Sequence, residues 1–362
     1  VSVLTDCPGL SPVEVERTVT FPMEAALNGL PRLVELRSVS RNGLSAVTVI
    51  FKDGTDIWFA RQMVLERVRG VEGSLPKVAG KPELSPVSGG LGEIYQFVVR
   101  SDKHSPMQLR TILDWEIVPK LRGVGGVIEV NTMGGDLKEY QVVVDRGRLH
   151  AHKMTLAAVA DALAKSNINV GGGYLDRSAE SFTLTAVGAL RTEEEIANVV
   201  LRTGADGTPL LVKHIGQVRV GSALRHGVIT RDGEGEAVTG VTMMLIGANS
   251  RDVVHAVKGR VAEIQRDLPP GVRIEPIYDR ADFVGRTLTT VLKNLVEGAL
   301  VVTIVLAIIL GTIRGALVVV LGIFSSMAIA LFGMHLFGVT GDLMSLGAID
   351  FGFLVDGPIV ML

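Results

Sequence analysis

Cysteine and aromatic residues are scarce: the 362 residues include one cysteine, two tryptophans, four tyrosines and eleven phenylalanines. The single cysteine, Cys7, excludes an internal disulfide framework and any metal site built from several thiolates. Because it stands beside Pro8 and Gly9, we expect it to be a small apolar residue in or after a strand. The formal net charge of −2 gives no support to a nucleic-acid partner.

Charge is almost absent from the C-terminal part of the chain. Only eight of the 74 Asp, Glu, Lys and Arg residues lie in the last 82 positions. Two runs without charge, 298–313 and 315–334, can cross a bilayer when the amphipathic segment before the first is included. The composition therefore predicts a soluble region joined to a membrane region. Arg314, the one charge between the runs, places their connection in the cytoplasm and residues 1–280 outside.

Neither end of the sequence is typical of a complete protein. No initiator methionine, basic segment or short apolar targeting segment opens the chain. The last residues, Met361 and Leu362, stop within an apolar run before any polar flank. We therefore expect a fragment of a longer protein.

The first 92 residues follow a β-α-β-β-α order. After a strand at 1–5, Ser11, Pro12 and Glu14 form a capping box that predicts a helix start. Asn42-Gly43 predicts a hairpin between strands at 34–40 and 44–51. With a second helix at about 56–74, this is the order of a split βαβ, ferredoxin-like module.

The next stretch repeats this plan. We predict a strand at 95–100, a helix at 107–121, a strand pair at 126–132 and 137–144, and a helix at 154–166. A later strand, helix and strand follow at 242–246, 249–268 and 272–278. In between, the pattern changes to short strands, a turn at 171–173 and a short helix opened by Thr192, which indicates an insertion.

These patterns predict an α+β membrane protein with tandem ferredoxin-like (βαββαβ) modules, an inserted subdomain and a transmembrane helix bundle. The expected boundaries are 1–92 for the first module, 93–167 with 240–280 for the second, 168–239 for the insertion and 281–362 for the membrane region. Its helices are expected at about 290–312, 315–337 and 342–362, the last one truncated.

Two carboxylates in the third apolar segment are the strongest functional signal. Ionisable side chains are costly in a membrane helix, so Asp350 and Asp356 are candidates for a proton or ion site. Six residues on a helix separate them by about 120° and about 9 Å, so they cannot form one small metal site alone. The alternative is that both aspartates lie at helix ends among lipid headgroups.

Three residues around the carboxylates have structural roles in this hypothesis. Pro358 has no amide hydrogen, so the carbonyl of Leu354 loses its helical partner one turn from Asp356 and can bind water. Gly352 and Gly357 permit close approach of neighbouring helices. Both features are typical of a helix inside a bundle.

The run from Asp350 to Gly357, Asp-Phe-Gly-x-x-Val-Asp-Gly, resembles the heavy-metal efflux branch of the resistance-nodulation-division (RND) transporters, the CzcA/CusA type. The resemblance covers the whole chain, including Tyr278-Asp279-Arg280 before a long helix. It implies that Asp356 belongs to the proton relay and that Asp350 is the extra aspartate of divalent-cation members, with a transient cation site there. Alanine is common in relatives where Pro358 stands.

The same resemblance implies a function for the whole protein. It would be a proton-driven inner-membrane pump that exports zinc, cobalt, cadmium or nickel. It would form a homotrimer whose docking insertions interlock, and it would bind membrane lipid, a periplasmic adaptor and an outer-membrane channel. It would need no cofactor, because the metal is its cargo and the proton its coupling ion. The principal metal site is unknown, because in the family it lies beyond this chain.

Several other interpretations remain open. An RND pump for amphiphilic drugs or for copper and silver ions would share much of this pattern. An intramembrane aspartyl protease needs its two aspartates on separate helices, and an inert anchor has no use for a buried acid. His150 and His152 stand among basic residues and are expected at a solvated surface. Adjacent Met243 and Met244 face opposite sides of a strand, whereas Met133 is expected to pack.

Overall fold

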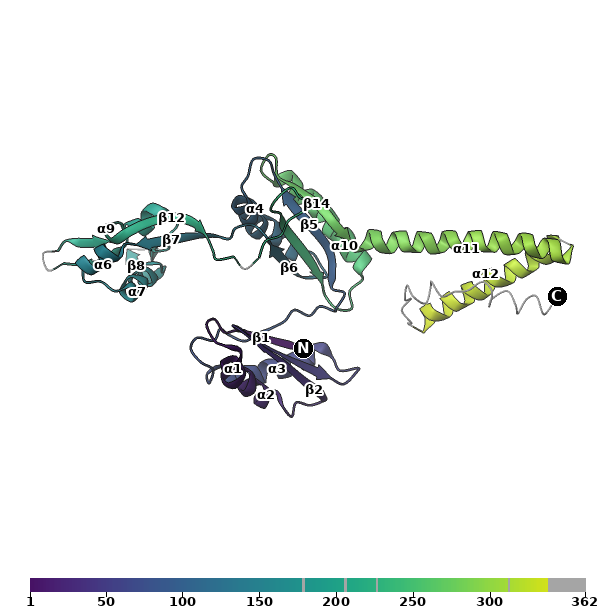
Figure 1. The fold of residues 1–362 in the computed structure, drawn as a ribbon, viewed down its shortest axis with the longest axis horizontal. Coiled ribbons are helices and arrows are strands. Elements are labelled where there is room, and N and C mark those ends of the chain that lie inside the picture. Colours follow the sequence, from purple (N-terminus) through teal and green to yellow (C-terminus); the bar gives the residue numbers. More distant parts are fainter. Residues whose placement is uncertain (178–179, 205–206, 226, 312, 338–362) are drawn as a thin grey trace.

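The computed structural model of the chain describes residues 1–177, 180–204, 207–225, 227–311 and 313–337. In this mixed α+β structure, two four-stranded antiparallel sheets each carry helices, and a third group of short elements is inserted into the second sheet. The insertion and the two long C-terminal helices extend from opposite ends of the second sheet and its helices (Figure 1).

The first sheet has the strand order β2-β3-β1-β4. Its strands are β1 (Ser2–Asp6), β2 (Leu33–Arg41), β3 (Leu44–Phe51) and β4 (Glu83–Leu84). Its helices are α1 (Pro12–Val15), the π-helical η1 (Glu16–Thr20), α2 (Phe21–Leu27) and α3 (Ile57–Glu72). Ser45, Val47 and Val49 alternate with less buried residues along β3 and face the core. The predicted hairpin is confirmed, because Arg41 pairs with Leu44.

Two helix starts in this module follow from local hydrogen bonds. The backbone amide and the hydroxyl of Ser11 donate to the Glu14 carboxylate at 2.9 and 2.7 Å. These bonds lower the pKa of Glu14, because they favour its charged form. Asp56 accepts a hydrogen bond from the Phe59 amide at 2.8 Å and begins α3. Both helices therefore begin where the side-chain sequence predicts.

The second sheet has the order β14-β5-β13-β6. Its strands are β5 (Glu93–Arg100), β6 (Val127–Met133), β13 (Val238–Met244) and β14 (Arg273–Asp279). Its helices are α4 (Pro106–Ile112), the π-helical η2 (Leu113–Ile117), α5 (Val118–Arg122) and α10 (Ser250–Asp267). Phe97, Leu113 and Val254 are fully buried in the core between sheet and helices. In both sheets the first strand in the chain lies between the third and the fourth.

The predicted partner of the strand at 137–144 was wrong. This strand, β7 (Lys138–Val144), pairs with β12 (Gly216–Ser222), and β6 pairs with β13 instead. Most residues of β7 are exposed or half-buried, whereas five successive residues of β13 are buried. An inner strand must be buried on both faces, so β13 takes the inner position. The insertion therefore begins directly after β6, and the helix predicted at 154–166 belongs to the insertion.

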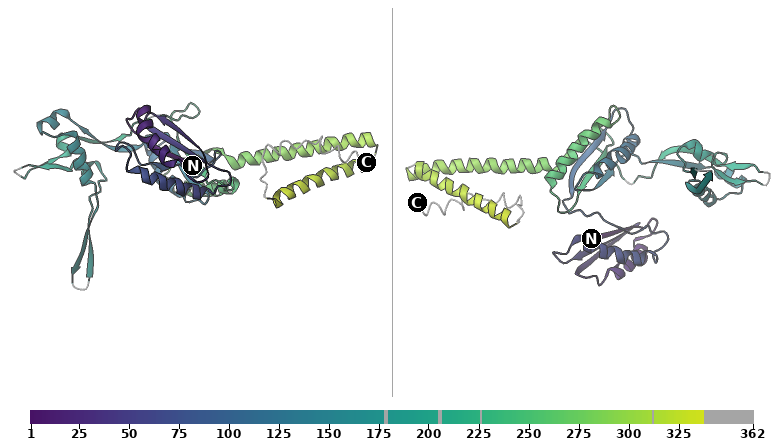
Figure 2. Two further views of the ribbon diagram at one scale, coloured as in Figure 1. Left: turned by 90° about the horizontal axis from the view of Figure 1, so that it is seen from below. Right: turned by 180° about the vertical axis from the view of Figure 1, so that it is seen from behind.

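The insertion contains a long hairpin. Besides this hairpin and the pair β7–β12, the insertion contains α6 (Arg146–Ala151), α7 (Leu156–Ser166), α8 (Glu193–Ala197), β10 (Val200–Thr203), β11 (Pro209–Leu211) and α9 (Val212–Ile215). Strands β8 (Val170–Arg177) and β9 (Glu180–Ala186) form the hairpin, which projects away from these elements in Figure 2 (left). The turn predicted at 171–173 was wrong: these glycines lie in β8, where the register shifts between Gly171 and Gly173.

Two long helices complete the described chain. Helix α11 (Arg280–Leu310) begins after Asp279, whose carboxylate accepts a hydrogen bond from the Asp282 amide at 3.0 Å. It ends at Gly311, which has a φ of +64°. Helix α12 (Ile313–Leu336) then runs back beside α11 (Figure 1). The two helices lie in the part of the chain where helices were predicted at about 290–312 and 315–337.

Candidate functional site

The carboxylates predicted to carry the function, Asp350 and Asp356, lie outside the described residues. The same holds for Gly352, Gly357 and Pro358, and for the whole third helix predicted at 342–362. The structure describes the two helices that precede them and the domains outside the membrane region.

Helices α11 and α12 are long and apolar enough to cross a membrane. Candidate spans cover Arg280–Val305 and Ile313–Met334, with mean hydropathies of 1.6 and 2.4. Ile308 and Ile329 have exposed fractions of 76% and 71%. Apolar side chains this exposed are costly in water, so these surfaces fit lipid or further helices.

A line of charged side chains runs along α11 from Asp282 to Glu297. Arg286 Nη2 lies 2.7 Å from Asp282 Oδ2, and Lys293 Nζ lies 3.8 Å from Glu297 Oε1. Both pairs have the four-residue spacing that places side chains on one helix face. All charges of α11 lie at or before Glu297, so its end at 298–310 can lie in the hydrocarbon without a charge.

Asp279 joins the second module to the start of α11. Its Oδ2 accepts a hydrogen bond from Lys258 Nζ of α10 at 2.7 Å, and only 13% of the aspartate side chain is exposed. Burial alone raises the pKa of Asp279, but the bonds from Lys258 and from the Asp282 amide outweigh it and hold the pKa below its usual range. The base of α11 is thus tied to α10 by a charged contact.

A cleft of about 970 Å³ separates the first sheet from the second. Its acidic and basic side chains are equal in number: Asp6, Glu83, Glu129, Arg61, Lys81 and Arg122. Among the described residues, no three His, Cys, Asp or Glu side chains lie close enough together to hold a metal ion. The described part of the cleft is therefore a mixed surface and not a preformed metal centre.

The adjacent methionines of β13 lie on different sides of the sheet, as predicted. Met243 lines the cleft, and its Sδ accepts a hydrogen bond from Asn131 Nδ2 at 3.1 Å. Met244 packs against the core of the second module. The two sulfur atoms thus cannot bind one cation. Met133 was predicted to pack, but 45% of it is exposed, so that prediction was wrong.

Within the residues that the structure describes, His150 and His152 near α6 form no cluster with other possible metal ligands. His150 is exposed in the last turn of α6, and His152 follows the helix and is half-buried. The carbonyl of His152 accepts a hydrogen bond from Arg202 Nη2 at 3.3 Å. The surface position predicted for His150 is confirmed. Cys7 is fully buried and burial raises the pKa of its thiol, as expected of an apolar residue.

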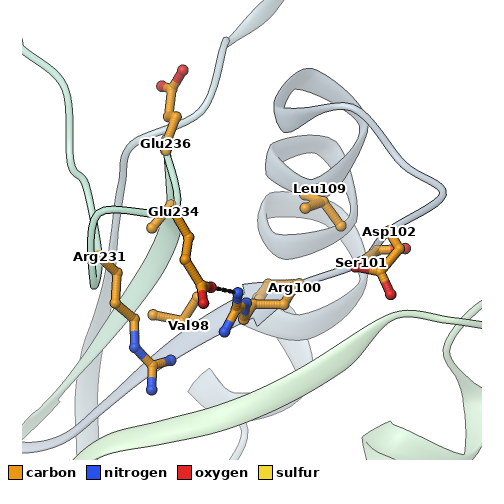
Figure 3. Close-up of a pocket in the computed structure, with 11 residues that line it drawn as sticks. Val98, Arg100, Ser101, Asp102, Leu109, Arg231, Glu234 and Glu236 are labelled. Atoms are coloured by element: carbon orange, nitrogen blue, oxygen red, sulfur yellow. Dashed lines mark hydrogen bonds and ion pairs between the residues drawn. The ribbon is translucent and has the colours of Figure 1, made fainter.

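A network of arginines and glutamates lines a pocket of about 200 Å³ on the second module (Figure 3). Arg100 of β5 pairs with Glu234, which raises the pKa of the arginine further. Arg231 Nη1 lies 3.0 Å from Glu275 Oε2 of β14. These side chains are 30–58% exposed, so each pair contributes little stability and mainly orients the chain segment that returns from the insertion.

Ion pairs also join the two chain segments that connect the insertion to the second module. Arg225 on the returning connection lies 3.2 Å from Asp136 on the outgoing one, and its Nη1 lies 2.6 Å from Glu236 Oε1. The Gly135 amide donates to the same glutamate oxygen at 3.1 Å. Sequence reasoning missed this cluster, because its members are far apart in the chain and follow no local pattern.

The chain matches the model of the AcrB/AcrD/AcrF family over residues 1–362. It is 44% identical to the cobalt-zinc-cadmium resistance protein CzcA of Cupriavidus metallidurans and 38% identical to the nickel-cobalt-cadmium resistance protein NccA of Alcaligenes xylosoxydans xylosoxydans. Both comparisons cover 100% of this chain, but only 34% and 36% of those relatives. The chain thus spans about a third of their length.

A solved structure of a heavy metal efflux pump has the same fold. It superimposes with a TM-score of 0.88 at 35% identity, over 99% of this chain and 36% of that one. The chain thus has the mixed α+β fold of that pump, with two sheets, an insertion and two helices long and apolar enough to cross a membrane. The chain belongs to the AcrB/AcrD/AcrF family, and the resemblance to its heavy-metal efflux proteins, expected from the motif at 350–357, is confirmed.

Proposed function

We propose that the chain is part of a proton-driven inner-membrane efflux pump that exports divalent heavy-metal cations. The observation that carries this proposal is the identity of 38–44% along the whole chain to proteins named for resistance to cobalt, zinc, cadmium and nickel. The cation efflux protein CusA of Escherichia coli is 37% identical. The higher identities favour the divalent cargo, and such a protein is a transporter and not an enzyme.

Asp356 is the proposed proton carrier, and Asp350 is the proposed second titrating group or transient cation site. A carboxylate in a membrane helix changes its charge when it binds a proton, and this change can bias a two-state movement of the bundle. A membrane potential adds about 2.3 kcal/mol per charge per 100 mV. Gly352 and Gly357 would let neighbouring helices approach, and Pro358 would free a carbonyl for water.

We infer that the two sheets are ferredoxin-like porter modules outside the membrane. The shared strand order supports this, because β1 and β5 hold the same place in the two sheets. The split βαβ order along the chain is also the same, apart from the insertion between β6 and β13. The cleft between the modules would open or narrow when one moves against the other.

We also propose that the pump is a homotrimer, joined to a periplasmic adaptor and an outer-membrane channel. The hairpin β8–β9 supports contact between copies, because it projects from the insertion (Figure 2) and its apolar side chains are exposed. Tyr174, Leu175 and Phe182 have exposed fractions of 76%, 53% and 49%. A projecting apolar hairpin is costly in water and suited to a neighbouring subunit.

Replacing Phe182 with aspartate in the full-length protein should weaken the trimer, because a charge would then be buried in the contact. The fraction of trimer can be measured by native mass spectrometry over a dilution series. Leu156→Asp is the matched control, since Leu156 is 64% exposed in the same insertion but lies on α7. Equal trimer fractions in both variants would remove the hairpin from the interface.

The cargo is tested with the full-length protein in a metal-sensitive bacterial strain. We expect higher tolerance to zinc, cobalt, cadmium or nickel and no change for silver or amphiphilic drugs. Asp350→Asn should lower the tolerance to divalent cations at equal protein level, because the uncharged amide can neither titrate nor attract a cation. Protection only against silver, or only against drugs, would assign the protein to another branch.

A further inference from the structure

A pocket of about 420 Å³ lies between α10 and the first turns of α11. Arg251, His255 and Lys258 of α10 line it on one side. Their spacing of four and three residues places them on the same helix face. On the other side, α11 contributes five apolar or small side chains and one carboxylate, that of Asp282, which pairs with Arg286 at 2.7 Å. The five are Ala281, Val284, Gly285, Leu288 and Thr289. The pocket thus has a basic wall and a mainly apolar wall.

The length of α11 sets the depth of this pocket relative to a membrane. Its 31 residues make a helix about 46 Å long, and a hydrocarbon core of about 30 Å needs about 20 of them. If the cytoplasmic end is at Gly311, the turns before about residue 291 project beyond the hydrocarbon. Leu288 and Thr289 then lie at the boundary, and the rest of the pocket lies at the level of the lipid headgroups.

Two of the basic side chains have no polar partner in the described part of the chain. Neither Arg251 nor His255 makes a side-chain hydrogen bond or ion pair there, and both residues are exposed. Lys258 contacts Asp279 at one end of the pocket. Gly285 has no atom within 4 Å of the position a Cβ would take, so the middle of the pocket is open. An anion could therefore reach Arg251 without breaking any of these contacts.

We propose that this pocket binds the headgroup phosphate of an anionic phospholipid from the outer leaflet, such as phosphatidylglycerol. Arg251 and His255 donate to the phosphate oxygens, and the first acyl methylenes lie against Leu288. The apolar wall favours a lipid over a soluble anion, because a free phosphate gains nothing from it. The proposal rests on the membrane location of α11 in the proposed function, but not on the cargo.

The test uses full-length protein purified in detergent and titrated with phosphatidylglycerol, with retained lipid counted by native mass spectrometry. Arg251→Gln should weaken the retention of the added lipid by about tenfold, the effect of losing one charged hydrogen-bond donor. Arg260→Gln is the matched control: it removes the same charge from the opposite face of α10, where Arg260 pairs with Glu263 at 2.9 Å. This control should retain lipid as the wild type does.

Two further measurements distinguish a lipid phosphate from a soluble one. Glycerol 3-phosphate at equal concentration should not displace the lipid, and phosphatidylcholine should be retained less than phosphatidylglycerol. Displacement by glycerol 3-phosphate, equal retention of both lipids, or equal loss in Arg251→Gln and Arg260→Gln would each overturn the proposal. Because the readout is bound lipid, a failure to transport metal leaves this test valid and bears only on the proposed function.

Discussion

Replacing Asp356 with asparagine in the full-length protein should abolish proton-coupled metal flux. Asparagine has nearly the same size as aspartate but cannot take up or release a proton, so the proposed relay loses its titrating group. In proteoliposomes with a pH gradient, uptake of zinc or cobalt should fall to the level of liposomes without protein. The variant should still insert and assemble, because its side-chain volume is unchanged.

Two variants separate the relay from a general effect of mutation. Asp356→Glu keeps an ionisable group on a longer side chain and should retain part of the flux. Asp161→Asn removes an exposed carboxylate from α7 in the insertion and should transport at the wild-type rate. Wild-type flux in Asp356→Asn, at equal protein per liposome, would falsify the relay assignment.

Replacing Gly240 with valine should destabilise the second module strongly. A Cβ at this position of β13 would lie 2.3 Å from Cζ of Phe97, which is itself fully buried in the core. Overpacking of this kind costs about 1–3 kcal/mol, and here the obstacle is a ring enclosed by the sheet and its helices. The midpoint of thermal unfolding of the solubilised full-length protein should fall, or the protein should fail to accumulate.

The steric cause can be checked in two ways. Phe97→Leu combined with Gly240→Val should be less destabilising than the sum of the single changes, because the smaller side chain makes room. Gly259→Ala is the control glycine substitution, in the exposed part of α10 with no atom within 4 Å of its Cβ position. It should be neutral or raise stability by about 0.5–1 kcal/mol. Additive losses in the double variant would contradict the proposed clash.

Local features of the fold could be predicted from the sequence. Ser11 and Glu14 mark a helix start, Asn42-Gly43 marks a hairpin, and Thr192 caps α8 with a hydrogen bond from the Glu195 amide at 3.2 Å. Each of these depends on neighbours within a few residues, so a short sequence contains all the information. The burial of Cys7 and the opposite directions of Met243 and Met244 were predicted for the same reason.

Strand partners could not be predicted in this way. The sequence predicts a hairpin of β6 and β7, yet β7 pairs with β12. Strand β6 pairs with β13, which lies more than a hundred residues later in the chain. Both Gly134 and Gly135 have positive φ, at 72° and 69°, and redirect the chain into the insertion. A two-residue turn and a redirected chain use the same glycines, so composition did not distinguish them.

The sequence alone indicated which segments are apolar enough to cross a membrane, where several of the helices begin and which carboxylates are candidates for the proposed proton site. These properties follow from the free energy of transferring each segment from water to a bilayer, and from hydrogen bonds within that segment. Only the tertiary structure decided the partner of β7, the cleft between the sheets and the pocket that Arg251 shares with α11. Such contacts join distant segments, and they depend on which combination of surfaces buries the most apolar area without leaving a polar group unpaired.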